Sequence, residues 1–274
     1  MSNYWQDRFD EQQVLLFDMT YEETQKILAK YYTNAIKDIK EDITKLYAFL
    51  LEHSTDGQLI ANDLFTYDRY FQTMNQIQAR LYDLGRKECV VLDREMYRMW
   101  DRVRDELVQY GPPVFKHIVA NPDAAKAVID SVWCADGKHW SERVYQHKEQ
   151  LQEAIQKGLM DCVARGANVD ALALTIANEG QVSWHNAQRI ARTELCHVQV
   201  HSTLKGYIDA GFEYYQFWSM EDDKTCKGDE THCEELRGKI FPIIEAQTGV
   251  NLPPIHPNCR CTIIPIVKGV NDNV

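Results

Sequence analysis

Hydrophobic residues recur at steps of three and four between residues 20 and 50, which is the period of an amphipathic helix. Thr20 and Glu23 have the spacing of a capping box, so a helix of about eight turns is predicted to begin at Thr20. Its apolar positions are Ile27, Tyr31, Ala35, Ile39, Ile43, Leu46 and Leu50. Residues 1–19 show no clean period and are expected to form an arm that docks on a partner or on the core.

Two further stretches continue this helical pattern. The second has a heptad-like seam, formed by Tyr67, Tyr70, Met74, Ile77, Leu81 and Leu84. The third has its apolar positions at Leu92, Met96, Met99, Val103, Leu107 and Tyr110. Gly85 is a candidate interruption between them, and Gly111-Pro112-Pro113 ends the third. Long helices joined by short turns are expected to fold back as antiparallel neighbours, with the Met and Tyr positions in the core.

From residue 121 the predicted helices are shorter. Asn121-Pro122 predicts a helix over 123–134, because proline is favoured at the first helical position. Ser141 is a candidate cap for a helix that ends at Gly166. A short Ala-rich helix is expected from Asn168 to Asn178, with a break at Gly180. A long helix over 182–210 follows and stops at Gly211.

After Gly211 the period changes to two, which indicates strands. Short strands are expected over 212–218, 237–241 and 261–264. The predicted fold is therefore mainly α with a small α+β carboxyl-terminal domain. In chain order it has long antiparallel helices, then a helix, short strands and a knuckle rich in cysteine and histidine.

Charge and composition disfavour several classes of function and location for this protein. The chain has 274 residues and a net charge of −11, which disfavours non-specific binding to nucleic acid. The start has no basic segment followed by an apolar run, so no signal peptide is expected. No apolar stretch approaches the roughly 18 residues of a membrane span. The protein is therefore expected in a reducing cytoplasm, where clustered cysteines more often bind metal than form disulfides.

The cysteines near the carboxyl end are candidate ligands of one zinc ion. Thiolates and imidazoles in two short clusters suit a tetrahedral zinc site. The first cluster is C-x6-C (Cys226 and Cys233), and the second is H-x2-C-x-C (His256, Cys259 and Cys261). The six-residue gap is longer than usual, so two disulfides, a redox pair or reduced thiols in a small core stay as alternatives. The other cysteines are expected to be small buried hydrophobes: Cys89, Cys134, Cys162 and Cys196.

Four ligands are favoured within this set, namely Cys226, Cys233, His256 and Cys259. Cys261 or His232 is a substitute for one of them. On an extended backbone Cys259 and Cys261 point to the same side, so both could ligate and leave His256 beside the site. The set leaves no obvious open position, which is typical of a structural zinc site rather than a catalytic one.

A second metal hypothesis lies on the predicted helix over 182–210. Glu194, His197 and His201 share one face there, so a metal-dependent hydrolase is an alternative function. The general-base glutamate of a zincin is missing, because position 198 is valine. Arg192 and Glu194 are two residues apart and cannot pair on one face. They are expected in a partly buried ion pair with residues elsewhere, with docking to the knuckle or a partner as the alternative.

Residues 187–265 resemble the phage Mu F-like family of minor head proteins, which is also typified by the minor head protein of phage SPP1. The matching pieces begin with A-x-R-I-A-R-T-E (Ala187–Glu194) and a Tyr-rich stretch that ends at Trp218. D-x-T-C follows (Asp223–Cys226), then Cys233, then L-x-G (Leu236–Gly238) and P-P-x-H-P-N-C-R-C (Pro253–Cys261). The stretch Trp133–Arg143 also looks like the region before this domain. The family commonly has a tighter cysteine pair, and often arginine where Lys224 stands.

The resemblance implies a non-enzymatic minor capsid protein of a tailed bacteriophage or prophage. Such proteins act in head morphogenesis at the portal vertex and affect genome packaging or delivery. Implied partners are the portal protein, the scaffold or major capsid protein, and phage DNA in a packaging role. Trp218 and Asp223 join Arg192 and Glu194 as candidate docking residues. The protein would be made in the bacterial cytoplasm and end in the virion.

The resemblance also implies a division of the chain. Residues 1–135 are expected to form a helical amino-terminal domain. Residues 136–268 are expected to form the minor head domain with its knuckle. Residues 269–274 are expected to be a tail.

Overall fold

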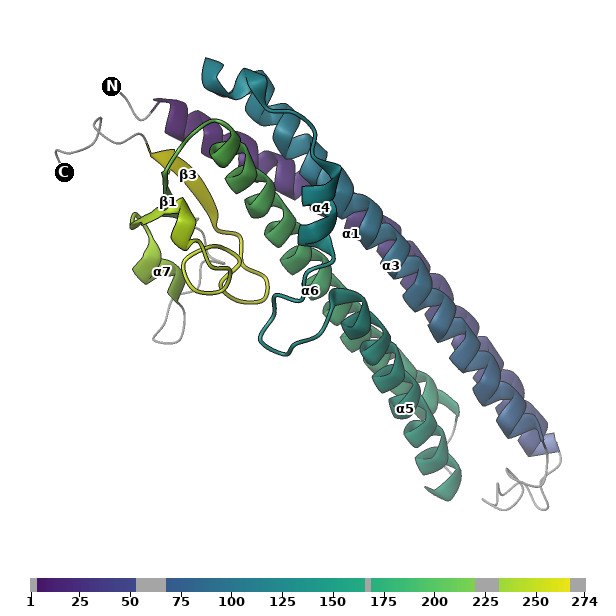
Figure 1. Cartoon of the computed structure of the whole chain (residues 1–274). Coiled ribbons are helices and arrows are strands. Elements are labelled where there is room, and N and C mark those ends of the chain that lie inside the picture. Colours follow the sequence, from purple (N-terminus) through teal and green to yellow (C-terminus); the bar gives the residue numbers. More distant parts are fainter. Residues whose placement is uncertain (1–3, 53–67, 166–168, 220–231, 267–274) are drawn as a thin grey trace. The chain divides into compact units, whose positions relative to one another are not determined.

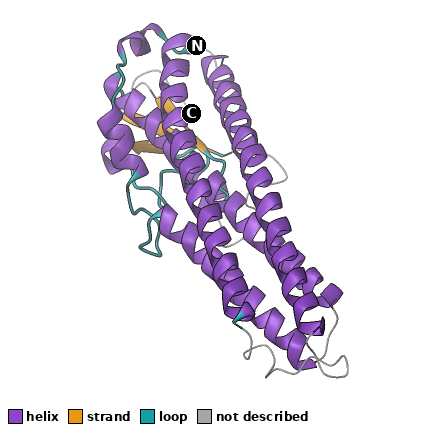
Figure 2. Cartoon of the chain, turned by 90° about the vertical axis from the view of Figure 1, so that its right-hand side faces the viewer, coloured by secondary structure: helices purple, strands orange, loops and turns teal. Residues whose placement is uncertain are grey.

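The structure is a computed structural model of the 274-residue chain, and it describes residues 4–52, 68–165, 169–219 and 232–266. These residues are mainly helical, with one small antiparallel sheet near the carboxyl end, so the predicted fold class is confirmed (Figures 1 and 2). The elements are α1 (Tyr4–Glu52), α3 (Arg69–Tyr110), η1 (Pro113–His117), α4 (Pro122–Ile129), α5 (Trp140–Arg165), α6 (Val169–Asp209), β1 (Tyr214–Trp218), α7 (His232–Leu236), β2 (Ile240–Pro242), η2 (Ile243–Glu245) and β3 (Thr262–Ile266).

Helix α1 begins at Tyr4, so residues 4–19 are its first turns and not an irregular arm. Leu16 and Phe17 are buried, which explains why this segment is part of the folded helix. Thr20 is not a cap, because it lies inside the helix and is completely buried. Its hydroxyl accepts a hydrogen bond of 2.8 Å from Arg102 of α3.

Two glycines that were expected to interrupt helices lie inside continuous ones. Helix α3 passes through Gly85 and α6 passes through Gly180. A Cβ atom at Gly85 would lie 3.0 Å from the ring of Tyr145, and one at Gly180 would lie 2.8 Å from Cδ1 of Ile36. Glycine is used here because neighbouring helices come too close for a side chain. The two separate helices expected around Gly180 are consequently one.

The start of α4 follows the prediction, but its end does not. Pro122 occupies the first turn, and the Asn121 side chain accepts a hydrogen bond of 2.9 Å from the N–H of Ala124. The helix ends at Ile129, five residues before the expected end at Cys134. Residues 130–139 therefore form a loop, and Trp133 lies in it.

The chain divides into two compact units, each built from separate stretches. The first contains Met1–Thr24, Leu92–Trp140 and Arg189–Val274, and the second contains Gln25–Val91 and Ser141–Gln188. This division in space differs from a split of the sequence near residue 135. The three-part division of the sequence stays a prediction.

The second unit has one hydrophobic core, made by residues of α1, α3, α5 and α6. It contains most of the predicted apolar positions of the first two stretches, including Ile39, Ile43, Ile77 and Leu81. At the start of the α1 stripe the buried residues are Leu28 and Tyr32, one position later than expected.

The first unit contains the sheet, in the order β2-β1-β3 with antiparallel pairing throughout. Along β1 the alternation expected from the sequence is present, with Tyr215 and Phe217 fully buried. The hydroxyl of Tyr207 on α6 donates a hydrogen bond of 2.9 Å to the carbonyl of Ile263 on β3. This bond and the Phe115–Tyr207 ring contact, 6.0 Å between centroids, fix α6 within the core of this unit.

Candidate metal centre

Three cysteine sulfurs converge in the first unit. Cys233 lies on α7, whereas Cys259 and Cys261 lie on the segment that leads into β3. Their Sγ atoms all lie within 4.8 Å of one another, and all three side chains are buried. Phe217, Leu236, Phe241 and Ile255 pack around them. Two segments distant in the sequence are therefore joined at one point, as the zinc hypothesis requires.

The sulfur spacing fits a metal better than a disulfide. The Sγ atoms of Cys233 and Cys259 are 3.9 Å apart, and the three cysteines are free thiols. A disulfide requires about 2.05 Å. Four ligands at about 2.3 Å around a tetrahedral zinc ion lie about 3.8 Å from one another. The observed separation is thus close to that between two thiolate ligands of one zinc ion.

His256 lies beside this cluster, at hydrogen-bonding range of two sulfurs. Contacts with the sulfurs of Cys233 and Cys259 raise the pKa of His256 to about 11. Its Nδ1 lies 2.8 Å from the carbonyl of Pro257, so Nδ1 can donate there and leave Nε2 for another partner. Metal-binding histidines commonly have this arrangement. His256 does not belong to the compact group of three, so direct ligation would require its ring to move inward.

The three thiols cannot all ionise together without a cation. Hydrogen bonds from Cys196, Cys233 and Cys261 lower the pKa of Cys259. The pKa of Cys261 is raised, because its neighbours Cys233 and Cys259 and its burial all oppose a second negative charge. The geometry therefore favours one thiolate in the absence of metal. A divalent cation would displace the remaining protons, as is usual for thiolate sites.

Cys196 on α6 is a member of this neighbourhood that the sequence did not reveal. It was expected to be a small buried hydrophobe, and it is indeed buried. Its Sγ lies 3.7 Å from the carbonyl of Cys261, and its thiol also contacts Cys259. Cys196 lies 63 residues before Cys259, so no local spacing rule would have included it.

The loop that carries Cys259 is attached to α6. Asn258 has a φ of 65°, a left-handed conformation that asparagine tolerates better than most residues. Its backbone N–H donates a hydrogen bond of 3.0 Å to Oγ1 of Thr193. The Thr193 hydroxyl in turn donates to the carbonyl of Arg189, at 2.7 Å. Thr193 thereby positions the residue next to a candidate ligand.

Arg192 and Glu194 have separate partners. The guanidinium of Arg192 lies over the ring of Tyr21, 5.0 Å from its centroid. Oε2 of the buried Glu194 accepts a hydrogen bond of 3.0 Å from the indole N–H of Trp133. The ion pairs expected for these two side chains stay a prediction. Their suggested role in docking a partner stays a prediction.

His197 and His201 are packed in a largely buried environment. The His197 ring stacks on Trp133, with centroids 4.5 Å apart, and burial lowers the pKa of His197 well below its usual value. Nε2 of His201 lies 2.8 Å from Oγ1 of Thr248, and burial lowers the pKa of His201 to about 4. Across the described part of the chain, only the three cysteines form a compact group of potential ligands. The geometry therefore does not bring Glu194, His197 and His201 together around one ion.

The remaining predicted site residues are placed only in part. Trp218 is the last residue of β1 and lies under the guanidinium of Arg237, 5.7 Å from the ring centroid. Cys226 and Asp223 lie outside the described residues. His232 begins α7, but its side chain is likewise not described. Among the helices that are described, none has the length and apolar character needed to cross a bilayer.

The region that contains this cluster matches a known family. Residues 153–264 match the model of the family described as Phage Mu protein F like protein. This part of the chain is similar to that family. The match includes α6, β1, β2 and the first part of β3, and Cys233, Cys259 and Cys261 all fall within it. The expected family resemblance is thus confirmed.

One curated relative is similar along nearly the whole chain. The NAD(+)--arginine ADP-ribosyltransferase EFV of Enterococcus faecalis is 25% identical over 288 residues. The match covers 98% of this chain but only 56% of that protein, so the chain spans about half of its relative's length. No solved structure matches the chain.

Proposed function

We propose that this chain is a minor head protein of a tailed bacteriophage or prophage. The match of residues 153–264 to the Mu F-like family carries this proposal, because the family implies phage head morphogenesis and a place in the virion. The finer role is assembly at the portal vertex, with an effect on genome packaging or delivery. The chain would fold in the bacterial cytoplasm before it enters the head.

The cysteine cluster has a structural part in this proposal. Cys233, Cys259 and Cys261 hold a zinc ion, and His256 supplies the fourth ligand after a small inward movement. The 3.9 Å sulfur separation and the burial of all three thiols support this assignment. Structural zinc typically contributes on the order of 10 kcal/mol of binding free energy to folding. Such a contribution would suit a sheet of only three short strands.

Metal analysis of the full chain tests the zinc assignment. We expect about one zinc per chain in the wild type, and much less in Cys259→Ser. Cys134→Ser is the matched control, because this cysteine lies outside the cluster and should leave the zinc content unchanged. His256→Ala and Cys226→Ser separate the two possible fourth ligands. Loss of zinc in Cys226→Ser but not in His256→Ala would overturn the choice of His256.

The portal role requires a separate experiment. We expect the chain to form a complex with the portal ring of the same phage or prophage, measured by mass photometry of the purified components. Absence of a complex at micromolar concentrations, in zinc-loaded protein, would count against portal binding. DNA could be contacted during packaging as well. Such contacts should weaken steeply with salt, because phosphate contacts release counterions.

We propose that this chain has no catalytic role. Activity in either of two assays would contradict this proposal. The first follows transfer of ADP-ribose from NAD⁺ to an arginine-containing acceptor, the reaction named for the relative from Enterococcus faecalis. That activity belongs to a protein of which this chain matches 56%, so it does not carry over directly. The second tests metal-dependent hydrolysis, which should vanish in His197→Ala if Glu194, His197 and His201 were catalytic.

A further inference from the structure

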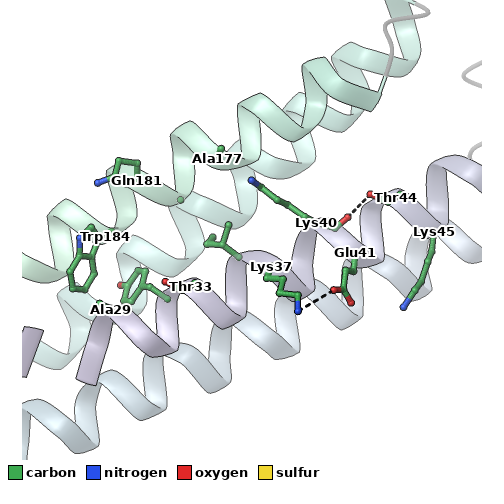
Figure 3. Close-up of a pocket in the computed structure, with 13 residues that line it drawn as sticks. Ala29, Thr33, Lys37, Lys40, Glu41, Thr44, Lys45, Ala177, Gln181 and Trp184 are labelled. Atoms are coloured by element: carbon green, nitrogen blue, oxygen red, sulfur yellow. Dashed lines mark hydrogen bonds and ion pairs between the residues drawn. The ribbon is translucent and has the colours of Figure 1, made fainter. Parts of the chain in front are cut away.

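The second unit contains a groove that neither the family nor the metal cluster explains. It lies between α1 and α6 and has a volume of about 920 Å³ (Figure 3). Its apolar surface is formed by residues of both helices, among them Ile36, Ala177 and Trp184. Gly180 also lines it, so part of the α6 wall is bare backbone.

The α1 wall of the groove is a single helical face. Its residues form two adjacent rows, each with a spacing of four residues, between Ala29 and Lys45, which corresponds to about 24 Å of helix. The first half of this wall contains Tyr32 and Ile36, and Tyr32 contacts Trp184 across the groove, with ring centroids 5.3 Å apart. The second half is cationic, with Lys37, Lys40 and Lys45. The groove therefore has an apolar end and a basic end.

The positive charge of the basic end is largely uncompensated. Lys37 lies 3.9 Å from Glu41, and both side chains are more than half exposed, so this pair is weak. Lys40 extends from α1 toward α6, where Figure 3 shows it near Ala177. Among the residues that the structure describes, Lys40 and Lys45 form no ion pair. The groove therefore contains three lysines and one glutamate, although the whole chain has a net charge of −11.

We propose that this groove binds one amphipathic helix of a partner protein, with an apolar anchor against Trp184 and acidic residues against Lys40 and Lys45. The spacing follows from α1: Ile36 and Lys45 are nine residues apart, or about 13 Å along the axis. A helix laid in the groove would therefore carry its Asp or Glu about two turns from its anchor. Recognition of an amphipathic helix by an apolar groove is a common mode of binding.

Charge complementarity favours an acidic helix over DNA. A DNA site would need several cations along a polar surface, with phosphates as the main partners. Here the cations are confined to one end, Glu41 lies among them, and the other end is aromatic and aliphatic. The inference does not depend on the zinc site, because no residue of the groove belongs to the first unit.

This proposal can be tested with a display library of helical peptides that have randomised surface positions. The full zinc-loaded chain serves as bait in the selection. We expect enriched peptides to combine a large apolar residue with Asp or Glu two turns away. Thr33→Trp should block the groove and weaken binding of an enriched peptide at least tenfold. Lys40→Glu with Lys45→Glu should do the same by charge reversal.

Two matched controls are available on the same helix. Asn34→Trp and Lys30→Glu change exposed α1 residues that do not line the groove, and both should bind within twofold of wild type. Circular dichroism would verify that each variant is folded. Failure to enrich any peptide would overturn the proposal, as would peptides without acidic residues or binding unaffected by Thr33→Trp. Stronger binding of duplex DNA, lost in the lysine double variant, would assign the groove to nucleic acid instead.

Discussion

The hydroxyl of Thr193 on α6 accepts a hydrogen bond of 3.0 Å from the backbone N–H of Asn258, the residue before Cys259. Thr193 is only 6% exposed, so this bond is shielded from water. It links the A-R-T-E motif to the loop that carries two of the candidate zinc ligands. The motif and the knuckle, which are far apart in the sequence, therefore act as one structural element.

Thr193→Val tests this link, because valine keeps the shape and removes the hydroxyl. The Asn258 N–H would lose its partner, and leaving such a group unsatisfied costs about 1–3 kcal/mol. We expect a lower midpoint of thermal unfolding and faster release of zinc to a chelator. Thr193→Ser keeps the hydroxyl and should resemble the wild type in zinc release. Equal zinc release from Thr193→Val and wild type would mean that the bond does not position the loop.

Much of the fold was predictable because long helices repeat their signal many times. The seam of Tyr70, Met74, Ile77, Leu81 and Leu84 is buried as expected. Predictions from single residues were wrong where the structural role of the residue depended on a neighbour that is distant in the sequence. Gly180 looked like a helix break, but it reflects the proximity of Ile36, which lies 144 residues earlier in the chain.

The candidate metal site was likewise predicted only in part from the sequence. The residue types and order were enough to predict that Cys233 and Cys259 meet, with Cys261 as a substitute ligand. Cys196 and Thr193 were not recognised, because their contacts with the knuckle arise only when α6 packs beside it. A helical period identifies a buried face, but it does not identify what lies against that face.

His201 should make the first unit sensitive to acid. Burial lowers the pKa of His201 to about 4, whereas an unfolded histidine titrates near 6.5. Below pH 6.5 the unfolded chain takes up a proton that the folded chain refuses, so stability is lost as pH falls toward 4. The loss is expected to be about 3 kcal/mol. His201→Gln should flatten the pH dependence of the free energy of unfolding between pH 7 and 4.

Thr248→Val is the control for this experiment. It removes the hydroxyl that lies 2.8 Å from Nε2 of His201 but keeps the titrating ring. This variant should be less stable than the wild type at pH 7 and should still lose stability in acid. If His201→Gln loses stability in acid as steeply as wild type, other groups cause the effect. His197 would then be the next candidate, because its pKa is also lowered by burial.

Glu106 on α3 should have the opposite pH dependence. Burial raises the pKa of Glu106 to about 7, and Oε2 is buried with no hydrogen-bond partner among the residues described. The folded chain therefore holds this proton up to about pH 7, whereas the unfolded chain releases it near pH 4.5. Stability from this group is present below pH 4.5 and is lost as pH rises through 7.

Glu106→Gln removes this titration while it preserves most of the shape. We expect the variant to be more stable than wild type at pH 8 by roughly 1 kcal/mol, a value reduced for partial exposure to solvent. At pH 4.5 the two should be nearly equal. Urea unfolding at both pH values measures the difference. An equal change at pH 8 and pH 4.5 would show that ionisation of Glu106 is not responsible.

A buried charge pair in the second unit gives the largest expected effect of a single substitution. Lys148 donates to Oε2 of Glu88 at 2.7 Å, and the hydroxyl of Tyr32 donates to the same oxygen at 2.7 Å. Glu88 is fully buried, and Lys148 is 3% exposed. Glu88→Gln would leave the Lys148 ammonium buried without its counter-charge. Such uncompensated charges cost about 3–5 kcal/mol.

The control follows from the same argument. Glu88→Met with Lys148→Met removes both charges, so the double variant should be more stable than Glu88→Gln, because no isolated charge remains. Tyr32→Phe keeps the pair and should cost only about 1 kcal/mol. Urea unfolding of the four proteins measures these differences. If the double variant is as unstable as Glu88→Gln, the destabilisation is caused by lost packing and not by an unpaired buried charge. Methionine does not fill either position completely, so such a loss of packing is the alternative explanation.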